Sequence, residues 1–213
     1  MSDPRPPALR WYFDFISPFA YLHWHKLRPL ARERAIDLVP VAFGAVLAAH
    51  GQKGPAEIRG KREFTYQHVL WTARREGVPL RFPPAHPFNP LTALRLCIVA
   101  GNTPDAVDAI FDWIWRQGEA GDSVEALSPV IQALGVDAAA IGADATKAAL
   151  RDNTESALVA GVFGVPTLSI DKQLFWGNDA HDFALDALQH PELFEDPEMQ
   201  RLQRLPVGIQ RRA

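Results

Sequence analysis

The spacing of apolar residues changes twice along the chain, and the resulting order of segments limits the possible folds more than any other feature. Short apolar runs typical of buried strands occur near the two ends, at residues 9–17, 36–44, 161–171 and 172–177. Helical spacing follows the first run over residues 18–34 and the last run over residues 178–190, where we expect a polar cap. The two ends therefore predict a β-α-β unit with parallel strands and a β-β-α unit.

The middle of the chain has a different character. Residues 45–151 carry an almost continuous helical pattern. It is interrupted by the proline-rich segment 81–90 and by glycine turns at Gly101 and at residues 118–121. Together with the two ends, this pattern predicts an α/β thioredoxin-like fold with a large all-α insertion.

The same pattern divides the chain into three parts. We expect residues 9–44 and 156–190 to form one discontinuous thioredoxin-like domain, and residues 45–155 to form the helical insertion. Residues 191–213 are a polar tail with scattered apolar side chains. The tail is either an arm that packs on a partner or a frayed end.

Composition and charge exclude several classes of protein. The 213 residues are 47% hydrophobic and 22% charged, as in globular proteins with a large core. The formal net charge of -3 gives no reason to expect a nucleic acid or an anionic membrane as partner. No apolar run reaches the roughly 18 residues that a membrane helix needs, and the first ten residues lack the apolar stretch of a secretory signal.

The few cysteine and histidine residues indicate neither a disulfide nor a metal site. Cys97 is the single cysteine, so no internal disulfide can form, and we expect a cytoplasmic protein. Because Cys97 lies in an apolar helical stretch, we expect it to be buried and inert. His23 and His25 have no companions at metal-ligand spacing, and we expect no metal at these positions or at His68.

Ser17 lies where the first predicted strand meets the first predicted helix. Ahead of Pro18 it is an ordinary helix N-cap, because its oxygen can accept a free N–H of the first turn. In the thioredoxin arrangement, however, this junction carries a Cys-x-x-Cys motif. The four positions here are Ser17, Pro18, Phe19 and Ala20, so the thiolate needed for dithiol–disulfide exchange is absent.

The segment 164–167, Gly-Val-Pro-Thr, is a second marker. Thioredoxin-like folds keep a cis-proline here that faces the strand–helix junction, and we expect a cis Val165–Pro166 bond on that ground. Such a bond would turn the backbone N–H and C=O of Val165 outward, free to pair with a peptide.

A resemblance to the 2-hydroxychromene-2-carboxylate isomerases extends from about residue 11 to residue 189. It lies in the successive stretches YFDFISPFAYL, GKREFTYQHVLWTARREGVPL, PFNPLTALR, NTESALVAGVFGVPT and LFWGNDAHDFALDAL. That family belongs to the DsbA-like branch of the thioredoxin superfamily and is related to kappa-class glutathione transferases. The resemblance implies a glutathione-dependent cis–trans isomerase of small aromatic catabolites, and a homodimer.

The implied chemistry suits a serine at a helix N-terminus. A free thiol is mostly protonated at neutral pH, so the site must favour the thiolate. The Ser17 hydroxyl can donate to a sulfur anion, and the N-terminus of the helix adds positive potential. We therefore expect Ser17 to be the catalytic residue that stabilises the thiolate of glutathione, a nucleophile that is not consumed.

The family positions imply contacts between glutathione and further residues, namely Lys61, Val165, Pro166, Asn178 and Asp179. The Val165 backbone would pair with the cysteinyl part. Asn178 and Asp179 would meet the γ-glutamyl end, with simple capping of the last predicted helix as the alternative. Lys61 or Arg62 would neutralise a carboxylate, with a solvated basic turn as the alternative.

The same positions imply that Phe19, Asn89 and Trp176 face the substrate. A turn-forming role is the alternative for Asn89, and packing on the sheet or in the core is the alternative for Trp176. The chain departs from the family at Ala180, where an arginine is usual, and this puts part of the glutathione site in doubt.

Two other functions remain open. A kappa-like glutathione transferase would use the same serine and thiolate, and would differ in whether the adduct is released. A non-catalytic thioredoxin-like binding module would not need Ser17, the Val165–Pro166 segment and the Asn178–Asp179 pair together.

Overall fold

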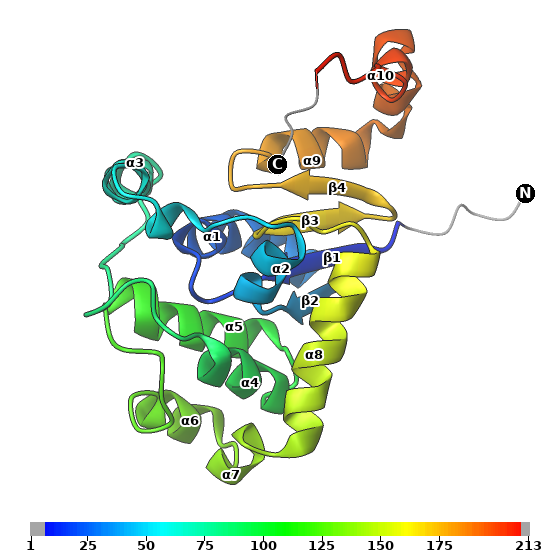
Figure 1. Ribbon diagram of the computed structural model, residues 1–213. Helices are drawn as coiled ribbons and strands as arrows, with labels where there is room; N and C mark the ends of the chain where they lie inside the picture. Colours follow the sequence, from blue (N-terminus) through cyan, green and yellow to red (C-terminus); the bar gives the residue numbers. More distant parts are fainter. Residues whose placement is uncertain (1–6, 210–213) are drawn as a thin grey trace, which may run out of the picture.

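The computed structural model describes residues 7–209, and its centre is a four-stranded sheet (Figure 1). The strands lie in the order β2-β1-β3-β4. Their bounds are β1 Leu9–Phe13, β2 Ile36–Pro40, β3 Thr167–Ile170 and β4 Gln173–Trp176. β1 is parallel to β2, and β3 is antiparallel to both β1 and β4. The predicted β-α-β and β-β-α units are confirmed.

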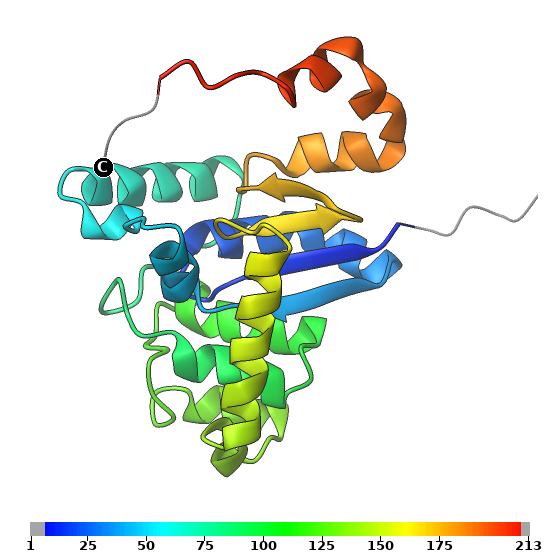
Figure 2. The ribbon, with the colours of Figure 1, turned by 45° about the vertical axis from the view of Figure 1, so that its right-hand side comes forward.

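Helices cover both faces of the sheet, because side chains alternate along a strand. On one face lie α1 (Pro18–Glu33) and α9 (His181–Gln189), and on the other lie α2 (Phe43–Ala49) and α8 (Asp144–Val159) (Figure 1 and Figure 2). Trp11 of β1 stacks on Trp24 of α1 at 5.2 Å. Tyr12, the next residue, belongs instead to a small cluster with Ala157 of α8.

The chain between β2 and β3 is helical, as predicted. After α2 it forms η1 Pro55–Glu57, α3 Lys61–Arg75, α4 Leu91–Val99, α5 Pro104–Phe111, the π-helical turn η2 Asp112–Arg116, α6 Ser128–Leu134, α7 Ala138–Ile141 and α8. The predicted break over residues 81–90 is a loop, and Gly101 and Gly118 make turns with φ of 77°. Within residues 7–209, no helix combines the length and apolar character needed to cross a bilayer.

The largest hydrophobic core joins the sheet to the insertion. Trp11 stacks on Phe13 at 4.4 Å, and Phe111 of the insertion lies 6.3 Å from Trp11. Trp115, also from the insertion, is fully buried in the same core, and a buried aromatic side chain of this kind stabilises the fold by roughly 2–3 kcal/mol. Cys97 of α4 is buried here as predicted, and burial raises the pKa of its thiol.

Two predictions about the ends of elements differ from the structure. β1 ends at Phe13, because the Asp14 carboxylate accepts the N–H of Ile16 at 2.9 Å and turns the chain. α9 begins at His181 without a side-chain cap, so the predicted polar cap is wrong. The domain boundary expected at residues 155/156 lies within α8, and the division into domains stays a prediction.

The tail continues from α9 through η3 (Pro191–Glu195) to α10 (Pro197–Leu202). Leu193 and Phe194 of η3 pack against the core. The later apolar side chains are exposed, namely Leu202, Leu205, Val207 and Ile209. Figure 2 shows the chain after α10 crossing back above the sheet toward α3.

Candidate active site

Three loops meet at the edge of the sheet where β1 ends. β1 and β3 are antiparallel, so the β1–α1 loop and residues 164–166 lie at the same edge. The carbonyl of Pro166 accepts the N–H of Gly177 at 2.9 Å, which holds the β4–α9 loop beside them. The Val165–Pro166 bond is cis, as expected. The sheet thus brings the strand–helix junction and the Val-Pro segment to one edge.

Ser17 is the N-cap of α1. Its Oγ accepts the N–H of Ala20 at 3.2 Å, and the residue is 8% exposed. A serine hydroxyl also has one hydrogen to donate, and no residue within 7–209 accepts it. Ser17 can therefore cap the helix and donate to an anion at the same time.

Asp14 lies three positions before Ser17 and is completely buried. Its carboxylate oxygens accept the N–H groups of Ile16 at 2.9 Å and of Phe43 at 2.8 Å, which ties the Ser17 loop to the start of α2. Burial raises the pKa of Asp14 to about 7, against the lowering effect of these N–H groups. Our sequence reasoning missed this residue, although a lone acid inside an apolar run marks it.

Two side chains of the insertion also hold the Ser17 loop. Trp115 donates from Nε1 to the carbonyl of Phe15 at 2.8 Å. His86 places Nε2 2.9 Å from the carbonyl of Ile16. Sequence reasoning missed both, because nothing local in the sequence connects them with a loop 70 and 100 residues away.

Trp176 closes one side of the Val-Pro segment. Its indole lies so near Gly164 that a Cβ there would collide with the ring, and it meets Phe163 edge-on at 5.3 Å. Trp176 is 55% exposed, so it does not pack in the core, and packing on the sheet stays open as its alternative role. The indole lies on the surface beside the site edge.

Asn178 is buried at the start of the β4–α9 loop. Its Nδ2 donates to Glu76 at 3.5 Å, and Lys26 pairs with Glu76 at 2.8 Å. Within the described chain, Asn178 Oδ1 has no hydrogen-bond partner. Asp179 is exposed. Because Ala180 is the N-cap of α9 and no side chain caps this helix, the capping alternative for Asn178 and Asp179 is wrong.

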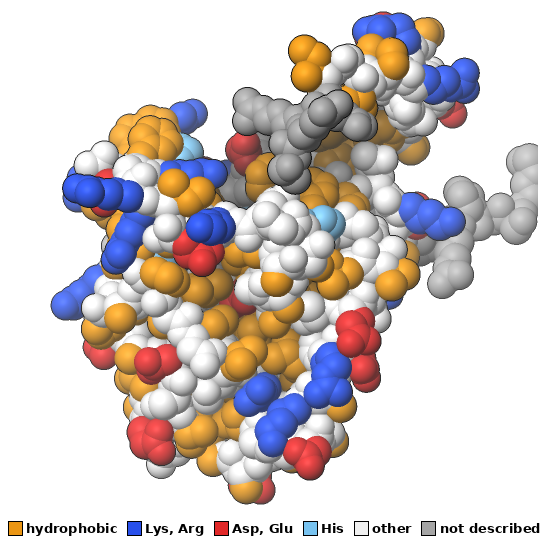
Figure 3. All heavy atoms as spheres, in the orientation of Figure 1, with side chains coloured by type: hydrophobic (Ala, Val, Ile, Leu, Met, Phe, Trp, Pro, Cys, Tyr) orange, Lys and Arg blue, Asp and Glu red, His pale blue; other side chains and the backbone are white. Residues whose placement is uncertain are grey.

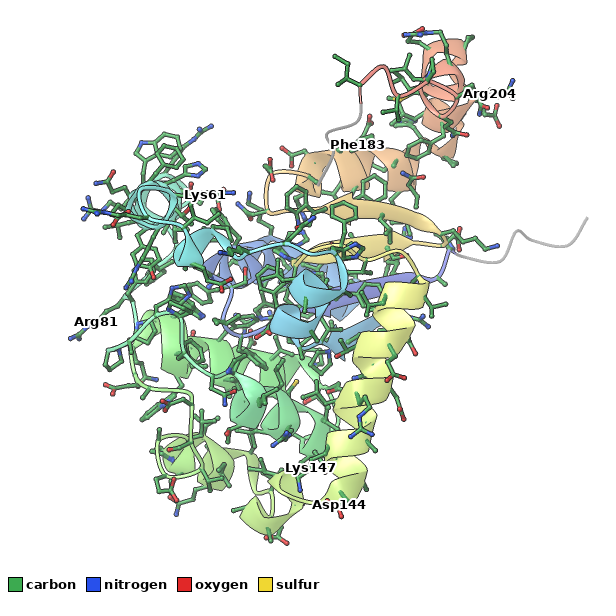
Figure 4. All side chains as sticks on the ribbon, in the orientation of Figure 1. Lys61, Arg81, Asp144, Lys147, Phe183 and Arg204 are labelled. Atoms are coloured by element: carbon green, nitrogen blue, oxygen red, sulfur yellow. The ribbon has the colours of Figure 1, made fainter. Side chains whose placement is uncertain are left out.

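Lys61 and Asn89 lie on the insertion. Lys61 begins α3 and is exposed, far from Asp144 and Lys147 at the other end of the molecule (Figure 4). Asn89 Oδ1 accepts the N–H of Leu91 at 3.1 Å, so the turn-forming alternative holds for Asn89.

Phe19 follows the Ser17–Pro18 junction and contacts an aromatic row on α3. His68 lies 5.9 Å from Phe19, and it stacks between Phe64 and Trp71 at 5.8 and 6.1 Å. Phe64 and Trp71 are exposed, and Figure 3 shows hydrophobic side chains gathered on α3 among lysine and arginine. α3 thus presents an aromatic surface near the start of α1.

Residues 8–189 match the model of a family described as a DSBA-like thioredoxin domain. The fold and the edge at Ser17 therefore define a DsbA-like thioredoxin protein whose Cys-x-x-Cys positions hold no cysteine. A 2-hydroxychromene-2-carboxylate isomerase from Sphingobium xenophagum is 33% identical over 186 residues, which cover 83% of this chain and 95% of that protein. The chain belongs to the 2-hydroxychromene-2-carboxylate isomerase family.

Two further proteins are similar over most of their length. A solved structure of 2-hydroxychromene-2-carboxylate isomerase has a TM-score of 0.74 at 24% identity and covers 90% of this chain and 98% of its own. Glutathione S-transferase kappa 1 from Caenorhabditis elegans is 22% identical over 91% of this chain and 96% of its own length. The structural match agrees with the thioredoxin-like fold predicted from the sequence.

Proposed function

We propose that this protein is a glutathione-dependent cis–trans isomerase of the 2-hydroxychromene-2-carboxylate type, acting on small aromatic catabolites. The observation that carries the proposal is the Ser17 hydroxyl, which caps α1 while no described residue accepts its hydrogen. The names of two relatives add support, one an isomerase and the other a glutathione transferase.

Several groups at the site edge suit glutathione. Asn178 Oδ1 is a buried acceptor without a partner inside residues 7–209, and the ammonium of a γ-glutamyl group would satisfy it. Asp179, exposed next to it, would add a negative charge for that ammonium. The Val165 backbone, ahead of Pro166, would pair with the cysteinyl part, and Lys61 would neutralise a carboxylate.

When bound, glutathione would supply a nucleophilic thiolate whose reversible addition to a conjugated alkene permits rotation about the former double bond. Ser17 donates its hydroxyl hydrogen to the sulfur and so favours the anion over the thiol. The N-terminus of α1 adds positive potential at the same place. Each unit by which the thiol pKa falls corresponds to about 1.4 kcal/mol.

The substrate side of the site is aromatic. Phe19 and the row Phe64–His68–Trp71 on α3 offer ring faces on one side of the Ser17 junction. Trp176 offers an exposed indole beside the Val-Pro segment. Asn89 would use its amide N–H groups toward the substrate, because its oxygen is already bonded to Leu91.

The test is to incubate the purified protein with 2-hydroxychromene-2-carboxylate, with and without glutathione, and to follow the absorbance spectrum. We expect conversion to the trans isomer only with glutathione, and no net loss of glutathione. Turnover without glutathione would refute the mechanism, and no turnover in either case would refute this substrate.

A kappa-like transferase is the second candidate, because the kappa relative matches nearly its whole length. The same assay with an aryl halide in place of the chromene separates the two. Consumption of glutathione with formation of a stable thioether would favour the transferase. No reaction with either compound would favour a non-catalytic thioredoxin-like binding module.

A further inference from the structure

The two carbonyl groups that precede Ser17 both accept ring N–H groups from the helical insertion. Trp115 Nε1 lies 2.8 Å from the oxygen of Phe15, and His86 Nε2 lies 2.9 Å from the oxygen of Ile16. A carbonyl oxygen can only accept. The hydrogen of a neutral His86 must therefore be on Nε2, pointing at Ile16.

The other side of His86 is held by α3. Tyr66 Oη lies 2.7 Å from Nδ1 of His86 and 2.8 Å from its carbonyl oxygen, and its single hydrogen is donated to one of these two acceptors at a time. Arg62 donates to the same carbonyl at 3.0 Å and stacks over the Tyr66 ring at 5.4 Å. The imidazole meets the rings of Phe82 at 5.9 Å and Trp115 at 5.5 Å. His86 is thus held in one orientation by α3 and by the core.

These contacts matter because a carbonyl oxygen carries a partial negative charge. An unpaired carbonyl on Phe15 or Ile16, the two residues before Ser17 in the chain, would oppose an anion at the Ser17 position and raise the pKa of a thiol bound there. An N–H donor binds the oxygen and offsets that charge. The two donors also fix the backbone from which Ser17 projects.

We propose that His86 and Trp115 are positioning residues that lower the pKa of a thiol held at the Ser17 position, by pairing the carbonyls of Ile16 and Phe15. The proposal deepens the function proposed above, in which that thiol belongs to glutathione. It gives the insertion a direct part in activating the thiol.

The experiment places a thiol at the site without glutathione. In a Ser17→Cys variant, the pKa of the new thiol is measured from the pH dependence of its alkylation by iodoacetamide, with the site identified by mass spectrometry. A cysteine at a helix N-terminus has a lowered pKa. Adding His86→Phe removes the donor to Ile16 and should raise that pKa by about one unit, a tenfold loss of thiolate.

Three further variants make the result specific. His86→Gln keeps an N–H donor and should restore most of the lowered pKa. Tyr66→Phe should shift the pKa in the same direction by less, and it serves if His86→Phe folds poorly. Trp113→Phe is the matched control, because Trp113 Nε1 also donates to a carbonyl, that of Ala120 at 3.0 Å, away from the Ser17 loop.

An unchanged thiol pKa in both His86→Phe and Tyr66→Phe would overturn the proposal, and so would an equal rise in Trp113→Phe. Binding of glutathione to the protein with serine at position 17 is measured separately by calorimetry. Absence of binding would refute the proposed cofactor while the alkylation result still decides the role of His86, and Trp115→Phe in the Ser17→Cys background, which removes the donor to Phe15, decides that of Trp115 in the same assay. The two failures are therefore distinguishable.

Discussion

Ser17 and Thr103 cap two helices in the same way, since each hydroxyl oxygen accepts an N–H three residues ahead at 3.2 Å. Replacing either by alanine removes a cap and should cost about 1 kcal/mol of stability. Of the two residues, only Ser17 lies at the edge of the sheet that carries the candidate site. Ser17→Ala should also lower the rate of isomerisation about a hundredfold, as loss of one donor to a developing anion does.

Thr103→Ala is the control for that experiment, measured by urea denaturation and by the chromene assay. We expect equal losses of stability in the two variants and full activity in Thr103→Ala. If Ser17→Ala keeps the activity of the native protein, Ser17 is only a cap.

Asp14 makes stability depend on pH in an unusual direction. Its pKa in the folded protein, about 7, is above the ordinary value of 3.8, so between these values the folded chain holds the proton better than the unfolded chain. The contribution of protonated Asp14 to the free energy of unfolding is complete below pH 3.8 and is lost as the pH rises through 7. Its size is on the order of 4 kcal/mol.

Asp14→Asn removes that titration, because an amide does not ionise. The variant also loses some stability from mismatched hydrogen bonds, by an amount that does not change with pH. We expect the native protein to lose stability relative to Asp14→Asn as the pH rises from 4.5 to 7.5, measured by urea denaturation at each pH. Parallel curves for the two proteins would show that the Asp14 pKa is ordinary.

At the scale of elements, the order of strands and helices could be predicted because period two and period 3.6 leave different patterns in the sequence. The end of β1 could not, because the turn at Asp14 depends on N–H groups of both its own loop and the start of α2. The roles of His86 and Trp115 were equally hidden. Their bonds to the Ser17 loop exist only once the insertion has packed against the sheet.

Gly164 in the α8–β3 loop leaves room for the indole of Trp176 at the end of β4. Gly164→Ala would place a methyl group against the Trp176 indole, which is exposed and can turn away, so the cost in stability should be about 1 kcal/mol or less. If Trp176 faces the substrate, KM for the chromene should rise severalfold with little change in kcat. Steady-state kinetics would measure both.

Gly142→Ala is the control for this change, because a Cβ at Gly142 meets only the carbonyl of Ala139 at an ordinary 3.8 Å. It should leave KM unaltered. If KM is also unaltered in Gly164→Ala, Trp176 does not contact the substrate.

At the scale of the whole molecule, the division into two domains is blurred by a shared core. Trp11 of the sheet and Phe111 of the insertion belong to one cluster. The predicted insertion therefore exists as a segment of sequence, but its helices pack against the sheet directly. Hydrophobic patterning shows which residues are buried, and it does not show which element they pack on.

The homodimer proposed from the family should use the tail. Leu205 and Val207 are 55% and 73% exposed, an apolar surface that a second copy would cover. Analytical ultracentrifugation should give about twice the chain mass of 23.6 kDa. The double variant Leu205→Asp, Val207→Asp should be a monomer.

Val159→Asp is the control, since Val159 is 91% exposed on α8, away from the tail. It should leave the dimer intact. A monomeric native protein would refute the homodimer, and a dimeric tail variant would refute the part assigned to the tail.

The position of β1 in the sheet has a consequence for synthesis of the chain. β1 lies between β2, which follows it closely, and β3, which begins only at Thr167. A ribosome adding about 5–20 residues per second needs roughly ten seconds to make the residues between β2 and β3. Throughout that time one edge of β1 has no partner, which is a hazard for aggregation. The nascent chain should therefore depend on chaperones until its last hairpin emerges.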